Sequence, residues 1–102
     1  MYLPSPRIRK LTLIFGTIES QQVLLHFFYS GTDLDIQNKS GNTALHLSAY
    51  RGNIDIVKLL VQHGANVFLR NEKGRCAADE AEVGSHRITA HFLHRKMQGI
   101  LR

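Results

Sequence analysis

The sequence predicts an all-α fold, a short solenoid of about three stacked helix pairs joined by hairpin-like loops. Two observations lead to this prediction. Residues 41–66 have the pattern of two short helices separated by a turn glycine. The same pattern recurs at a constant interval, equal to the separation of Gly31 from Gly64, and a period of this length is typical of a repeat architecture.

The first expected helix of this unit spans Ala44–Arg51. Gly41 provides a backbone turn before it, and the Thr43 hydroxyl can accept a hydrogen bond from an early backbone N–H. Gly52 follows the helix and tolerates the left-handed geometry in which many helices end. The helix therefore has a start signal and a stop signal of its own.

The second expected helix spans about Ile54–His63 and stops at Gly64. Asn53 is a suitable N-cap, and the negative charge of Asp55 in the first turn suits the helix dipole. Both helices are too short to persist alone, because isolated helices need roughly 12–15 residues. The second is apolar nearly all round and therefore needs neighbours on more than one side. Its polar residues form only a narrow stripe: Asp55, Lys58 and Gln62.

The repeat interval supplies those neighbours. It places turn residues of one unit on those of the next, with Gly31 on Gly64, Asn38 on Asn71, Gly41 on Gly74 and Ala44 on Ala77. Apolar positions follow in the same register: Val23 on Ile56, Leu24 on Val57, Phe27 on Leu60, Phe28 on Val61, Leu34 on Val67 and Ile36 on Leu69. Chance alignment of short helices would not match glycines and apolar positions together.

The stretch GNTALHLSAYRGNIDIVKLLVQHGAN resembles an ankyrin repeat, with Ala44 in place of the usual proline. The flanking segments LTLIFGTIESQQVLLHFFYSGTDLD and NEKGRCAADEAEVGSHRITAHFL are similar to degenerate repeats of the same family. The resemblance implies that Thr43 and His46 hold the turn regions of adjacent repeats together by hydrogen bonds. Cys76 and Asp79 replace these residues in the last repeat, so the resemblance does not carry the network over to it. The expected structural residues are Gly41, Thr43, His46, Gly52, Gly64 and Gly74.

The expected domain organisation is one ankyrin-repeat domain over residues 10–98, with repeats at about 10–36, 37–69 and 70–98. Residues 1–9 would form an N-terminal extension and residues 99–102 a tail. The last helix has a broad polar face, as expected where a solenoid ends in water: Arg87, His91, Arg95 and Gln98. We expect the apolar residues of this helix to pack against the preceding repeat: Ile88, Phe92, Met97, Ile100 and Leu101.

The first repeat has no such polar face. Leu25 falls at the position of Lys58, where the central repeat has a polar residue, and further apolar residues surround it: Val23, Leu24, Phe27, Phe28 and Tyr29. Exposed apolar patches of this kind usually mark an interface. Residues 1–9, further repeats or a partner could cover this face, and we expect self-association or a longer array.

Composition limits the class of protein. The 102 residues are enough for one domain, and 43% hydrophobic with 21% charged residues is ordinary for a folded globular chain. The single cysteine, Cys76, excludes an internal disulfide framework and indicates a reducing, intracellular location. No apolar run approaches the roughly 20 residues that cross a bilayer, and the N-terminus does not have the pattern of a signal peptide.

No pattern in the sequence indicates catalysis, and we expect neither an enzyme nor a cofactor. His91 and His94 lie three apart on a helix, with His86 or Asp79 nearby, but no cysteine pair or H-E-x-x-H spacing accompanies them. We therefore expect no metal site. The carboxylates are expected to be solvated turn and helix residues: Asp33, Asp35, Asp79, Glu80 and Glu82. Cys76 lacks a histidine placed by any nucleophile motif.

Function is expected at the concave side of the stack, where hairpin tips and first helices line up. The resemblance implies partner contacts at Gln37, Lys39, Ser40, Asn42, Tyr50, Arg51, Arg70, Glu72, Lys73 and Arg75, none of which we expect to be needed to build the fold. Five of these are basic and one is acidic. They predict a protein partner with an acidic segment, with Tyr50 and Arg51 as anchors, because Tyr and Arg are enriched among residues that dominate interface energy.

The alternative function is binding of nucleic acid or an anionic membrane surface through the basic terminal segments. The net charge of +5 and the stretches RIRK and HRKMQGILR are compatible with phosphate contacts. Because no nucleic-acid-binding motif occurs, we expect a protein partner rather than nucleic acid.

Overall fold

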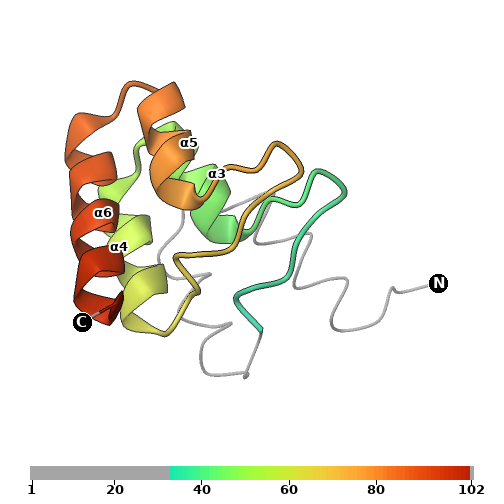
Figure 1. Cartoon of the computed structure of the whole chain (residues 1–102), viewed down its shortest axis with the longest axis horizontal. Helices are drawn as coiled ribbons and strands as arrows, with labels where there is room; N and C mark the ends of the chain where they lie inside the picture. The colour runs from blue at the N-terminus through green and yellow to red at the C-terminus, as the bar shows by residue number, and fades with distance from the viewer. Residues whose placement is uncertain (1–32, 102) are drawn as a thin grey trace, which may run out of the picture.

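The computed structural model describes residues 33–101, and within this part four helices and no strand occur (Figure 1). They are α3 (Ala44–Arg51), α4 (Ile54–Gln62), α5 (Ala77–Val83) and α6 (Arg87–Leu101). The predictions for residues 1–9 and for the helices and apolar face of the first repeat lie outside the described residues. Two complete helix pairs remain, and they confirm the all-α fold.

The two helix pairs stack in sequence order. α3 packs beside α5, the first helices of their repeats, and α4 packs beside α6, the second helices (Figure 1). Within each repeat α3 contacts α4 and α5 contacts α6. The described chain therefore has a layer of first helices and a layer of second helices, and the loops before α3 and α5 project from the first layer (Figure 1).

α3 occupies the predicted range because its ends are chemically marked. Thr43 has an extended backbone, and its hydroxyl accepts a hydrogen bond from the His46 N–H at 3.3 Å. The His46 side chain in return accepts the Thr43 N–H at 3.1 Å, which completes a capping box. At the other end Gly52 adopts φ 73°, and its N–H bonds to the carbonyls of the last turn.

α4 begins as predicted but ends at Gln62, one residue earlier than expected. His63 leaves the helical geometry, and one nitrogen of its ring bonds the Leu59 carbonyl at 2.9 Å. At the start of α4 the Asn53 side chain accepts the Ile56 N–H at 3.4 Å. The histidine thus caps the helix terminus through its ring instead of extending it.

The core lies between the two layers. Ile56, Val57 and Leu60 of α4 are at most 1% exposed, and Leu93 of α6 is fully buried. Five buried alanines lie on α3 and α5, and side chains this small allow the two helices to approach closely: Ala44, Ala49, Ala77, Ala78 and Ala81. α4 therefore packs against both α3 and α6, as its largely apolar surface requires.

α6 ends the described stack with the predicted polar face, since Arg87, His91, Arg95 and Gln98 are exposed. Phe92 and Met97 pack against the core as expected, but Ile88 does not. It is 77% exposed in the first turn of α6, facing a groove rather than the interior. α6 also continues to Leu101, into the segment that we assigned to a tail.

Candidate functional site

Each described repeat is preceded by a hairpin loop built around one asparagine. The Asn38 N–H donates to the Asn42 carbonyl and the Gly41 N–H to the Asn38 carbonyl, both at 2.9 Å. The Asn38 side-chain oxygen accepts the N–H groups of Ser40 and Asn42, both at 3.0 Å. A side chain that bonds its own following backbone in this way stabilises a turn.

The second hairpin repeats this geometry one repeat later, around Asn71. The Asn71 N–H donates to the Arg75 carbonyl and the Gly74 N–H to the Asn71 carbonyl, both at 2.9 Å. The Asn71 side-chain oxygen accepts the N–H groups of Lys73 and Arg75, both at 3.0 Å. The sequence period is therefore reproduced bond for bond in the turns.

The two hairpins are joined side by side. The Glu72 N–H donates to the Ser40 carbonyl at 3.0 Å, and the Gln37 amide bridges the Gly41 and Arg70 carbonyls at 2.8 and 3.1 Å. Gly41 permits this approach, because a Cβ there would lie 2.8 Å from the Glu72 nitrogen. The tips thus form one continuous surface.

His46 connects the two repeats from a buried position. One ring nitrogen, Nδ1, accepts the Thr43 N–H at 3.1 Å, which leaves Nε2–H to donate to the Arg75 carbonyl at 2.9 Å. This arrangement requires the neutral ring, with the tautomer assigned from its partners. Loss of solvation at this buried site lowers the pKa of His46 below 6.5, although the Arg75 carbonyl and Glu80 act in the opposite direction. The His46 ring therefore links the cap of α3 to the hairpin of the next repeat by hydrogen bonds.

We expect the stability contributed by His46 to depend on pH. As the pH falls through 6.5, the unfolded chain gains a proton at this residue that the folded chain does not. The contribution is complete above pH 6.5 and is lost as the pH falls toward the lower pKa of the folded state. Urea unfolding between pH 8 and pH 5 would measure this decline.

His46→Gln should flatten part of this pH dependence and also cost about 1–3 kcal/mol at pH 8, where buried partners lose their bonds. His91→Gln, at an exposed site on α6, is the matched control and should keep the wild-type profile. Identical pH profiles for wild type and His46→Gln would show that His46 is not the group that titrates.

A second network joins the two hairpins to α5, and it contradicts the expectation that Glu80 is a solvated helix residue. The Asn71 amide donates both to Asn42 Oδ1 and to Glu80 Oε1 at 2.9 Å, and Arg75 Nη1 lies 3.7 Å from the same Glu80 oxygen. Asn71 and Glu80 are each only 8% exposed. The alignment of Asn38 with Asn71 was the available signal, because an asparagine fixed at one turn position indicates a bonded side chain.

The last repeat retains a cap although its usual residues are replaced. Asp79 Oδ2 accepts the Cys76 N–H at 3.2 Å, which is the bond that an N3 side chain makes in a capping box, and it also accepts a hydrogen bond from the Cys76 thiol at 3.4 Å. Burial raises the pKa of the Cys76 thiol, which favours the protonated donor form. Asp79 makes this bond within its own repeat, whereas His46 reaches across to the next one.

We call the ten predicted contact residues the hairpin face: Gln37, Lys39, Ser40, Asn42, Tyr50, Arg51, Arg70, Glu72, Lys73 and Arg75. The structure brings eight of them together on the two joined loops. Tyr50 and Arg51 lie at the opposite end of α3, separated from the loops by a helix about 12 Å long. Both are exposed.

Three hairpin-face residues also build the fold, in contrast to our expectation. Gln37 bridges the hairpins, Asn42 accepts a bond from Asn71, and Arg75 lies against Glu80 with its side chain 39% exposed. The remaining loop side chains project into solvent: Lys39, Ser40, Arg70, Glu72 and Lys73. Arg70 Nη1 donates to the Gly74 carbonyl at 2.8 Å, which orients its charge along the hairpin.

The groups considered for chemistry have other partners in the structure. Asp33 accepts the Asp35 N–H at 2.9 Å, and Asp35 accepts the Asn66 N–H at 2.8 Å, as turn residues do. His94 pairs with Glu82 at 3.3 Å. Within residues 33–101 no group of three or more His, Cys, Asp or Glu side chains could hold a metal ion. In the same part of the chain, none of the helices has the length and apolar character needed to span a bilayer.

Stacked helix pairs joined through bonded hairpins define this molecule as a helical repeat protein of the solenoid class. The family model described as Ankyrin repeats (3 copies) matches residues 14–99, most of the chain. The chain belongs to the ankyrin-repeat family, whose repeats generally mediate protein–protein interaction.

Several curated proteins resemble the chain. It is 35% identical over 78 residues to the Notch-regulated ankyrin repeat-containing protein of Homo sapiens, covering 76% of this chain and 68% of that protein. It is 45% identical over 82 residues to the E3 ubiquitin-protein ligase hecd-1 of Caenorhabditis elegans, covering 78% of this chain and 3% of that protein. The NF-kappa-B inhibitor cactus of Drosophila melanogaster is 42% identical over 62 residues, or 60% of this chain and 12% of that protein. The chain thus spans only a small part of the last two relatives.

Proposed function

We propose that the chain is a non-catalytic, intracellular interaction module, an adaptor, scaffold or regulatory unit, that binds an acidic segment of a partner protein on its hairpin face. One observation supports this most strongly. The bond from the Glu72 N–H to the Ser40 carbonyl sets two hairpin tips side by side, so their exposed side chains form one patch. Lys39, Arg70 and Lys73 give that patch a positive charge, and Glu72 is its single acidic member.

The rigidity of the patch favours recognition. Each tip is fixed by bonds to Asn38 or Asn71, and the two tips are fixed to each other by Gln37. A partner therefore meets charges that are already positioned, which reduces the entropy lost on binding. Because the lysines lie at an exposed rim, their attraction should weaken as salt is added.

We expect Lys73→Glu to lower partner affinity about tenfold, because a charge of the wrong sign at the tip repels carboxylates of the partner. Arg51→Glu tests the anchor at the opposite end of α3. Arg75→Glu is less informative, since the new carboxylate would lie beside Glu80 and disturb the fold. Proteins retained by the immobilised chain at low and high salt would be identified by mass spectrometry.

Arg87→Glu is the matched control, because Arg87 is an exposed basic residue at the start of α6, in the other helix layer. The proposal requires proteins that Lys73→Glu releases and Arg87→Glu retains. Equal losses from both variants would show that overall charge, rather than the hairpin face, governs retention.

A further inference from the structure

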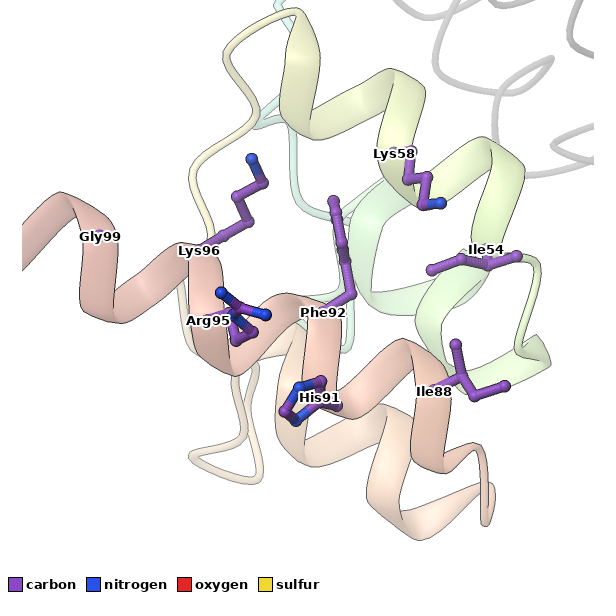
Figure 2. Close-up of a pocket in the computed structure, with 8 residues that line it drawn as sticks. All are labelled: Ile54, Lys58, Ile88, His91, Phe92, Arg95, Lys96 and Gly99. Carbon is purple, nitrogen blue, oxygen red and sulfur yellow. The ribbon is translucent and has the colours of Figure 1, made fainter.

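A groove lies between α4 and α6, in the layer of second helices (Figure 2). Its volume is about 650 Å³, and residues of both helices line it. The lining is of two kinds: apolar Ile54, Ile88 and Phe92, and cationic Lys58, Arg95 and Lys96. The groove shares no residue with the hairpin face, so it is a separate surface.

The apolar lining is incompletely covered by the protein itself. Phe92 is only partly buried, although it packs against the core, and Ile54 is also partly buried. Ile88 is 77% exposed, although a large aliphatic side chain gains stability when it is removed from water. Ile54 and Ile88 lie on facing helices at the same end of the groove (Figure 2). A side chain inserted there would cover both isoleucines.

The cations at the groove are arranged around one aromatic ring. Lys58 of α4 places its Nζ 5.8 Å from the centroid of the Phe92 ring, and Lys96 of α6 places its Nζ at 5.5 Å (Figure 2). Both distances fit a cation–π contact. Two helices thus direct ammonium groups to the same ring, although like charges repel.

Within the described part of the chain, no acidic residue lines the groove beside these charges. Among residues 33–101 neither Lys58, Lys96 nor Arg95 forms a salt bridge. A carboxylate arriving from outside would be attracted by both lysines at once, beside an apolar surface where water screens the charges less. The groove is therefore complementary to a ligand that is both acidic and apolar.

We propose that the groove between α4 and α6 is a second docking surface, which binds an acidic segment of a partner protein with an aliphatic side chain inserted among Ile54, Ile88 and Phe92. Carboxylates on either side of that side chain contact Lys58, Lys96 and Arg95. Of the three apolar residues only Ile88 projects, whereas Ile54 and Phe92 are recessed, so the groove is better suited to an inserted peptide side chain than to a bilayer surface. The chain's own charge of +5 disfavours a second copy as occupant.

The test is an NMR titration of the ¹⁵N-labelled chain with a short synthetic peptide in which runs of glutamate flank a pair of leucines. We expect amide shifts around Lys58, Phe92 and Lys96. Lys96→Glu and Ile88→Ser should each weaken binding about tenfold, because one reverses a charge at the groove and the other removes its exposed apolar contact. Both residues are exposed, and circular dichroism would verify that the variants fold.

Matched controls separate the groove from the hairpin face. Lys39→Glu, at a hairpin tip, should leave affinity at the groove within about twofold, and replacing the leucines of the peptide with serine should weaken it. Shifts confined to residues 37–42 and 70–75 would overturn the groove while supporting the hairpin face. Shifts confined to the groove would support it whether or not the hairpin face binds.

Two further results would also overturn the proposal. If Lys39→Glu and Lys96→Glu weaken peptide binding at the groove equally, the peptide is held by the overall charge of the protein and not by the groove. Absence of peptide shifts, together with binding of phosphatidylserine vesicles that Ile88→Ser abolishes, would assign the groove to a membrane surface instead.

Discussion

Leu60→Ala is expected to lower the free energy of unfolding by about 2–5 kcal/mol. Leu60 is fully buried in α4, and its side chain belongs to the core between the two helix layers. Truncation removes apolar contact and leaves a cavity that the surrounding helices fill only in part. Because small domains have only about 5–15 kcal/mol of stability, this single change should remove a large fraction of that stability while the stack still folds.

Urea unfolding followed by circular dichroism measures this loss. Gln62→Ala, two residues further along the same helix, is the control, because Gln62 is exposed and its replacement should change stability by less than about 0.5 kcal/mol. A loss below about 1 kcal/mol for Leu60→Ala would mean that α4 does not present this face to the core.

Gly41→Ala is expected to cost about 2–4 kcal/mol, from two sources. Gly41 adopts φ 77°, a left-handed conformation that strains any residue with a Cβ. The added Cβ would also lie 2.8 Å from the Glu72 nitrogen and 3.0 Å from the Asn71 Cα, both backbone atoms of the next hairpin. The hairpins would have to separate to accept it.

Gly74→Ala separates the two sources. Gly74 holds the equivalent position in the second hairpin with φ 76°, and a Cβ there would meet no atom within 4 Å. It should cost only the conformational strain, about 1–2 kcal/mol. Equal losses in thermal or urea unfolding for the two variants would show that the hairpins do not touch at Gly41.

Much of the fold could be predicted because its determinants are local. Thr43, Gly52 and Asn53 mark helix ends through contacts within a few residues, so α3 and the start of α4 occupy the expected ranges. The constant repeat interval then gives the stacking order, since each repeat meets its neighbour in the same register. α4 ends one residue before the predicted end, His63, whose ring bonds the Leu59 carbonyl.

The sites were harder to predict, because they depend on which residues meet across repeats. Asn42, Asn71 and Glu80 are separated in sequence, and only stacking of the hairpins brings them into one network. Asp79 caps the helix of the last repeat by accepting the Cys76 N–H. The family pattern could not predict this bond, because it has a threonine and a histidine at these two positions. The place of Ile88 in the groove could not be predicted from the sequence. Hydrophobic periodicity shows which face of a helix is apolar, but it does not show how much of that face the adjacent helix covers.

We expect the two described helix pairs to support each other as one cooperative unit that holds the hairpin face in place. Native-state hydrogen exchange, measured on wild type and on Leu60→Ala, tests this most directly. The amides of Leu60 in α4 and Leu93 in α6 should open with the same free energy, and the substitution should lower both by the same amount. If the amide of Leu93 keeps its full protection while that of Leu60 is lost, the two helix pairs fold independently and do not form one cooperative unit.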